Sequence, residues 1–240
     1  MPCPRGAAAA AVWLSLVGSA VAQAPPPTVP AHRVTTAVRV DGRLDDAIYA
    51  ATPAISSFVQ QEPLEFQPAT EKTEAWVFFD DDNIYVSARC WETAPDRRVA
   101  NEMRRDTSQL RQNDTFLVLF DTFHDRRNGY LFYANAIGGL ADGQVTDEGP
   151  PNMDWNTVWS VKTADFEGGW TIEMAIPFKS LRYLSGPAQV WGIQFRRSIR
   201  RKNEWTYWTP VPRNLAGPMA LNRVSAYGSI VGLDLPAASK

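Results

Sequence analysis

The feature that most constrains this chain is an alternation of apolar and polar residues with a period of two. In the segment GWTIEMAIPF (169–178) the apolar set is Trp170, Ile172, Met174 and Ile176. The segment QVWGIQFRRSIRR (189–201) has one face formed by Trp191, Ile193, Phe195 and Ile199 and another formed by Gln194, Arg196, Ser198 and Arg200. Successive side chains of a β-strand point to opposite faces of a sheet, so both segments are predicted to be strands with one buried face. Trp170 and Trp191 are therefore predicted to be core residues.

Further strands follow from the same pattern. They are predicted over residues 74–80, 83–91, 114–121, 130–137, 157–163, 204–209 and 227–233. Clusters of Gly, Pro, Asn and Asp at 80–83, 125–129, 138–139, 167–169 and 185–187 indicate turns between strands. Short helical turns are expected only near 44–51 and 178–183. Strands of this length without long helices between them predict an all-β fold, an antiparallel β-sandwich or jelly roll of immunoglobulin-like size.

Composition excludes several classes of protein. Fifteen glycines and eighteen prolines argue against a helical bundle, and a net charge of −2 argues against a surface built to neutralise nucleic acid. The two histidines are His32 and His124, and the two cysteines are Cys3 and Cys90. Zinc sites with four His or Cys ligands and HExxH sites are therefore excluded. Cys90 lies in an alternating strand and is expected to be a small buried residue.

The first residues indicate export. Arg5 supplies a positive charge, residues 7–21 are apolar, and Ala20-Val21-Ala22 offers a cleavage site for a signal peptide spanning 1–22. A membrane anchor is the alternative, but the apolar stretch is shorter than the roughly 20 residues of a spanning helix. The proline-rich residues 23–33 are interpreted as an extended linker, followed by a domain over 34–234 and a tail over 235–240. We expect the mature chain in the periplasm, associated with the outer membrane, or secreted.

Several motifs, in order, resemble family 9 carbohydrate-binding modules. The segment VRVDGRLDDAIYA (38–50) carries the family's opening pattern at Asp41, Gly42, Leu44, Asp45, Asp46 and Tyr49. The resemblance continues through residues 78–90, 113–138, 155–163, 168–178 and 191–210 and covers about 34–234. The last segment looks like the amino-terminal module of bacterial proteins of unknown function in which this domain precedes an outer-membrane β-barrel. The resemblance implies a non-catalytic glycan-binding sandwich whose site holds a terminal sugar between two tryptophans.

The candidate ligand-binding residues are aromatic platforms and planar polar side chains. Trp91 and Trp208 lie at strand ends and are the predicted platforms, with Trp205 nearby; alternatively, each tryptophan covers a sandwich edge. The polar candidates are Arg126, Asn135 and Gln144. Asn135 precedes Gly138-Gly139, so a turn-capping role is the alternative for this residue.

Charged segments offer weaker interpretations. Two carboxylates among Asp142, Asp147, Glu148 and Asp154 could hydrolyse a glycosidic bond at a suitable separation, but solvated turn carboxylates are favoured. Oxygen atoms of Asp121, Asp125 and Asn128, or of residues 80–82, could hold a structural calcium ion, although the spacing is not that of an EF-hand. The basic residues Arg196, Arg197, Arg200, Arg201 and Lys202 are interpreted as a solvated strand end that could contact a barrel or an anionic glycan. We assign no catalytic residue, no metal ligand and no required cofactor.

The sequence therefore predicts an exported module that docks a sugar end in an aromatic cleft and is associated with carbohydrate catabolism. A periplasmic interaction domain, without a sugar site, that serves an outer-membrane barrel on the same or another chain is the alternative. A glycoside hydrolase is the weaker alternative. Nucleic acid is not expected as a partner.

Overall fold

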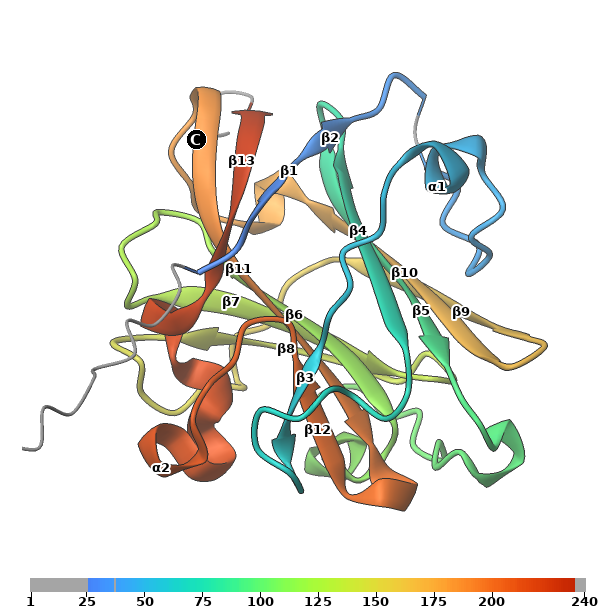
Figure 1. The fold of residues 1–240 in the computed structure, drawn as a ribbon. Coiled ribbons are helices and arrows are strands. Elements are labelled where there is room, and N and C mark those ends of the chain that lie inside the picture. Colours follow the sequence, from blue (N-terminus) through green and yellow to red (C-terminus); the bar gives the residue numbers. More distant parts are fainter. Residues whose placement is uncertain (1–25, 37, 236–240) are drawn as a thin grey trace, which may run out of the picture.

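Two β-sheets pack face to face in the computed structural model, which describes residues 26–36 and 38–235 (Figure 1). The predicted signal peptide and residues 236–240 of the predicted tail lie outside the described residues. The small sheet has the order β2-β4-β5-β10-β9. Its strands are β2 (His32–Arg33), β4 (Thr73–Phe79), β5 (Asn83–Trp91), β9 (Ser160–Phe166) and β10 (Gly169–Pro177).

The large sheet has eight strands in the order β1-β13-β11-β6-β7-β8, with β12 paired to β11 and β3 paired to β12. Its strands are β1 (Thr28–Pro30), β3 (Val59–Glu62), β6 (Thr115–Asp121), β7 (Gly129–Asn135), β8 (Leu140–Val145), β11 (Gly186–Ile199), β12 (Glu204–Tyr207) and β13 (Gly228–Leu235). Only the pairs β1–β13 and β2–β4 are parallel among the described strands. The all-β antiparallel sandwich is confirmed.

The helical segments are short. They are α1 (Ala47–Ala51), α2 (Arg213–Ala216) and 3-10 turns at Pro95–Arg97, Ser108–Gln112, Phe178–Ser180, Arg200–Lys202, Gly217–Asn222 and Val224–Ala226. The helical turns predicted near 44–51 and 178–183 are present. The helical turns within residues 213–226 were not predicted, because each of them is too short to show a helical period in the sequence.

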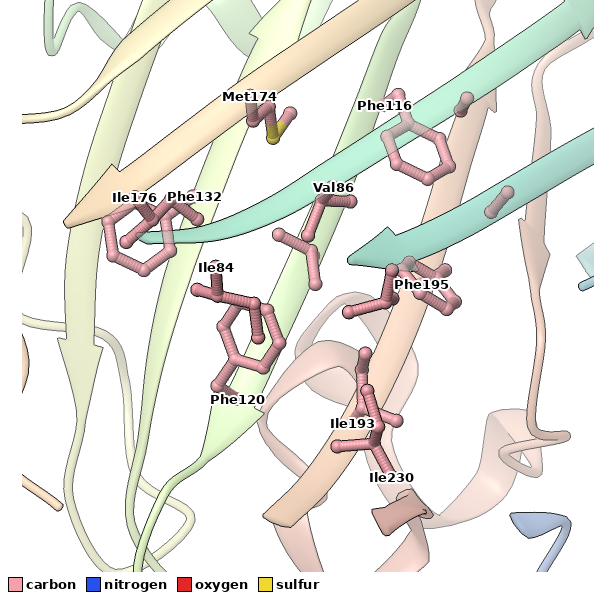
Figure 2. Close-up of a cluster of buried hydrophobic side chains, with 14 of the residues drawn as sticks. Ile84, Val86, Phe116, Phe120, Phe132, Met174, Ile176, Ile193, Phe195 and Ile230 are labelled. Carbon is pink, nitrogen blue, oxygen red and sulfur yellow. The ribbon is translucent and has the colours of Figure 1, made fainter. Parts of the chain in front are cut away.

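The main core lies between the sheets (Figure 2). Its members alternate along the strands of both sheets, so that Ile84 and Val86 of β5 face Phe116 and Phe120 of β6 across the interface. Trp170 and Trp191 are fully buried in this core, as is Cys90. The period-two pattern therefore identified the inner face of each sheet correctly.

The outer face of the small sheet is covered by residues 38–54, including α1. Glu173 on β10 accepts hydrogen bonds from the backbone N–H groups of Asp41 and Gly42 at 2.9 and 2.7 Å and from the Tyr49 hydroxyl at 2.6 Å. A Cβ atom on Gly42 would lie 2.7 Å from the Thr163 carbonyl carbon, and Gly42 has φ +91°, so only glycine fits this turn. The opening motif 38–50 is thus fixed to the sheet through one buried carboxylate.

The proline-rich segment differs from the expected free linker. It is extended, but Thr28–Pro30 pairs with β13 of the large sheet and His32–Arg33 pairs with β4 of the small sheet. Prolines are tolerated here because both strands lie at sheet edges. The described fold therefore begins before Val34 and the segment joins the two sheets along one edge (Figure 1).

The basic residues on β11 and after it differ from the expected solvated strand end. Arg197 is 1% exposed and donates to the carbonyl oxygens of Lys72 and Trp91 at 3.0 and 2.8 Å. Arg201 and Lys202 both form salt bridges with the buried carboxylate of Glu71. Three of these five positive charges lie beside the carboxylates of Glu71 or Glu92, which the alternation could not indicate because these partners come from segments distant in the sequence.

Candidate functional site

The outer face of the large sheet carries a pocket, here called the Trp205 pocket, of about 260 Å³. The strand register sets its floor: Tyr133 on β7 lies beside Leu117 on β6, which lies beside Arg196 on β11. Trp205 on β12 pairs with Ser198 and therefore shares the face of Arg196. Side chains from four neighbouring strands thus meet at one place.

Segments between the strands form the walls of the Trp205 pocket. Leu131 on β7 and Ser198 on β11 extend the floor, and the wall residues are Arg111, Gln112, Pro151, Met153, Arg200, Leu221 and Asn222. Two backbone hydrogen bonds hold the segment next to Met153 against β8. The Gln144 N–H donates to the Asn152 carbonyl at 3.0 Å, and the Asn152 N–H donates to the Gln144 carbonyl at 2.7 Å. A Cβ atom on Gly143 would lie 3.0 Å from the Met153 sulfur, so glycine allows this close approach.

The polar side chains of the Trp205 pocket are cationic or neutral, and no carboxylate is among the described residues that line it. Arg196 is 9% exposed, and its guanidinium carbon lies 5.7 Å from the centroid of the Trp205 ring. Arg200 donates to the Gln112 side chain at 2.9 Å. Burial raises the pKa of the Tyr133 phenol, opposed by the neighbouring charge of Arg111. Tyr133 is therefore a neutral hydrogen-bonding group in the pocket floor.

A second hollow of about 280 Å³ lies at the edge of the sandwich and is here called the Trp155 hollow. It is lined by Tyr130, Gln144, Trp155, Lys179, Ser180, Leu181 and Arg182. The rings of Tyr130 and Trp155 lie 5.0 Å apart at 40° and form an aromatic wall. Of the residues predicted to bind a ligand, Gln144 lines this hollow and Trp205 lines the Trp205 pocket.

Trp208 differs from the predicted platform, because it lies in the core between the sheets. It is 7% exposed, and its ring meets the Phe195 ring at 5.9 Å. A Cβ atom on Gly228 would lie 2.4 Å from the Trp208 ring, which shows how tightly the indole is packed. Trp208 therefore presents no free ring face to a sugar.

Trp91 is half-buried on the outer face of the small sheet, opposite the core. Its indole N–H donates to the Glu74 carboxylate at 2.9 Å, and the Phe166 ring meets it edge-on at 4.9 Å. Lys72 Nζ lies 5.7 Å from the Trp91 ring centroid. Trp91 lies on the outer face of the small sheet and Trp208 lies in the core, so they do not form the predicted aromatic cleft.

Asn135 takes the turn-capping alternative. It is fully buried, and its Oδ1 accepts from the N–H groups of Ile137 and Gly139 at 3.2 and 2.8 Å. Its Nδ2 donates to the Glu102 carbonyl at 2.6 Å and to Asn113 Oδ1 at 2.9 Å. Asn135 therefore fixes the loop that continues to Arg111 instead of contacting a ligand.

Arg126 lies outside both hollows. It occupies the β6–β7 turn with φ 58°, its N–H donates to Asp121 Oδ2 at 2.8 Å, and its exposed side chain contacts the Ser225 carbonyl at 3.3 Å. Asp125 likewise accepts from the N–H groups of Arg127 and Asn128 at 2.9 Å. Asp121 and Asp125, which were considered as calcium ligands, therefore accept hydrogen bonds from the backbone of the turn between β6 and β7.

The carboxylates within residues 142–154 were expected to lie in solvated turns, but Asp142 lies on β8 and is fully buried. It accepts from Arg105, from the Thr157 N–H and from the Trp159 indole at 2.9, 3.1 and 3.1 Å. Burial raises the pKa of Asp142 above its usual value, although these donors oppose the shift. In the part of the chain that the structure describes, no group of three or more His, Cys, Asp or Glu side chains is placed to hold a metal ion.

Comparison with known families adds to this geometry. A family model described as "Carbohydrate family 9 binding domain-like" matches residues 40–204. The chain belongs to this family. No curated protein matches it.

Solved structures share the fold of this family 9 domain. A family 9 carbohydrate-binding module from Caldicellulosiruptor kristjanssonii in complex with cellotriose has a TM-score of 0.58 at 16% identity, over 88% of this chain and 95% of that chain. The same module in complex with glucose gives 0.58 at 16%, over 89% and 97%. A candidate carbohydrate-binding protein from Bacteroides uniformis gives 0.64 at 12%, over 88% and 100%. These likenesses confirm the sandwich fold that the motifs predicted.

Sequence reasoning missed most of the Trp205 pocket in this family 9 domain. Tyr133 alternates with the buried Phe132 and so could have been placed on the outer face, but nothing in the sequence put it beside Arg196. Arg111 and Met153 come from loops without any motif. Among the described residues, no helix has the length and apolar character required to cross a membrane.

Proposed function

We propose that this family 9 domain is a non-catalytic carbohydrate-binding module that binds one sugar unit of a glycan in the Trp205 pocket. The observation that carries the proposal is the convergence of Trp205 and Tyr133 with the planar polar side chains of Gln112 and Arg196 around one hollow. Aromatic faces bind the C–H faces of sugars, and planar polar groups bind their hydroxyls. The volume of about 260 Å³ is near the lower end of small-molecule pockets, which begin at roughly 300 Å³.

The relatives support the class of ligand. The Caldicellulosiruptor module was solved with cellotriose and with glucose, so these two sugars are the first probes for this chain. A binding role also agrees with the buried state of Asp142, which is engaged by three donors and is not free to act on a glycosidic bond.

Calorimetry with glucose, cellotriose and a panel of mono-, di- and oligosaccharides tests the proposal. We expect Trp205→Ala to weaken binding of the best ligand by roughly tenfold, because it removes an aromatic contact. Trp91→Ala is the matched control, since Trp91 is also half-buried but lies on the small sheet. No heat with any sugar would reject the proposal, and a loss of binding in Trp91→Ala alone would move the site to the small sheet.

We further propose that the chain acts outside the cytoplasm in carbohydrate catabolism and is associated with an outer-membrane β-barrel in cis or in trans. The support is the pattern of residues 1–22 and the resemblance of residues 191–210 to modules that precede such barrels. Expression of the full chain in a Gram-negative host, followed by cell fractionation and amino-terminal sequencing, tests export. A cytoplasmic product that retains Met1 would reject it.

A further inference from the structure

We propose that the Trp205 pocket selects a sugar unit that carries an anionic substituent, a carboxylate or a sulfate ester, and that Arg196 binds the charged group. This inference rests on the saccharide binding proposed above and names the class of sugar. Uronic acids are the simplest ligands of this chemistry.

The three arginines that line the Trp205 pocket have no salt-bridge partner among the described residues. Arg111, Arg196 and Arg200 all line it, no carboxylate does, and none of the three forms a salt bridge with a described residue. By contrast, Arg197 and Arg201, from the same basic stretch, lie near the carboxylates of Glu92 and Glu71. The protein therefore neutralises its inward-facing arginines and leaves those of the pocket without an anion.

Arg196 is the strongest indication of an anionic ligand. The residue is more than nine-tenths buried, and its Nε is buried without a hydrogen-bond partner among the described residues. A buried guanidinium without an anion is unfavourable, and proteins normally pair such a group with a carboxylate or with a bound ligand. Since the described residues that line the pocket include no acidic side chain, a ligand anion is the partner that fits.

The position of Arg196 also fits recognition of a sugar derivative. Its guanidinium carbon lies over the Trp205 ring, 5.7 Å from the ring centroid, so the cation stands against one face of the aromatic ring. A guanidinium binds planar carboxylates and sulfates through paired N–H donors. One ligand could then place its ring against Trp205 and its substituent against Arg196.

The Trp155 hollow is a weaker candidate for the same role. It also contains two cations, Lys179 and Arg182, but both side chains are exposed. Water and salt screen exposed charges, so these cations need no bound anion. Arg182 therefore serves as the matched arginine for the experiment.

The experiment is calorimetry of the full chain with sugars that differ only in the substituent: glucose, glucuronic acid and glucose 6-sulfate. We expect at least one anionic sugar to bind roughly tenfold or more tightly than glucose at low salt, with the preference falling as salt rises. Arg196→Gln should abolish the preference, whereas Arg182→Gln should keep it. Binding of the sulfate ester alone, or of the uronic acid alone, would support the inference and identify the substituent.

Four outcomes would overturn it. Equal binding of glucose and both anionic sugars would reject the inference while leaving saccharide binding intact, and no binding of any sugar in the wider panel would reject both. Loss of the preference in Arg182→Gln instead of Arg196→Gln would place the anion in the Trp155 hollow. Should Arg196→Gln fail to fold, Arg196→Met decides by the same comparison, and an unchanged preference for the anionic sugar in the Arg196 variant would reject the inference.

Discussion

Arg196 and Arg197 are neighbours on β11 that face opposite sides of the large sheet, and the structure predicts a large loss of stability for the same substitution at one and a small change at the other. The perturbation is Arg197→Met. Arg197 donates to the Trp91 carbonyl at 2.8 Å, to the Lys72 carbonyl at 3.0 Å and to Thr73 Oγ1 at 3.2 Å. It also lies 3.8 Å from a Glu92 oxygen, and both side chains are almost completely buried.

The expected loss of stability depends on which hydrogen bonds the partners of Arg197 keep after the substitution. Removing one member of a buried ion pair costs about 3–5 kcal/mol when the other charge is left alone. Glu92 is not left alone, because Arg98 Nε still donates to it at 2.9 Å, and the Lys72 carbonyl still accepts from the Trp91 N–H at 3.0 Å. The main loss is therefore the donor to the Trp91 carbonyl and part of the charge that balances Glu92. We expect Arg197→Met to lower the free energy of unfolding by about 2–4 kcal/mol.

Urea unfolding at pH 7, followed by tryptophan fluorescence, measures this change. Arg196→Met is the matched control, and we expect it to change the free energy of unfolding by less than about 1 kcal/mol, because Arg196 has no carboxylate partner. A loss below about 0.5 kcal/mol for Arg197→Met would refute the reasoning, as would an equal loss in the two variants.

Two further predictions concern the packing of the sandwich. Glu173 is 1% exposed, and burial raises the pKa of its carboxyl group above the usual value. The wild type therefore loses stability as the pH rises through that raised pKa, because the folded state must then hold a buried charge. Glu173→Gln should therefore become more stable relative to the wild type between pH 4 and pH 8 in urea titrations, and a constant difference would contradict this. Gly228→Ala should lower the free energy of unfolding by roughly 1–3 kcal/mol, because the new Cβ would lie 2.4 Å from the Trp208 ring, whereas Ser229→Ala in the same assay should have little effect.

The sequence by itself determined which segments form strands and which face of each is buried. The alternation placed Trp170 and Trp191 in the core, and the predicted strand at 83–91 coincides with β5 (Asn83–Trp91). It failed at β8 (Leu140–Val145), where Gly143 and the buried Asp142 break the apolar pattern. It also failed at Trp208, which was predicted as a ligand platform at the end of the strand 204–209 but lies just beyond the observed β12 (Glu204–Tyr207) and packs into the core.

The tertiary structure alone decided what the polar and aromatic side chains contact. Arg196 and Arg197 look equivalent in the sequence, yet one lines a pocket and the other lies beside a buried carboxylate. Asn135 and Trp205 both were candidates for ligand binding, yet the first caps a turn and the second lines the pocket. The physical reason is that a period of two fixes the face of a strand, whereas a binding site depends on which strands become neighbours and which loops close over them.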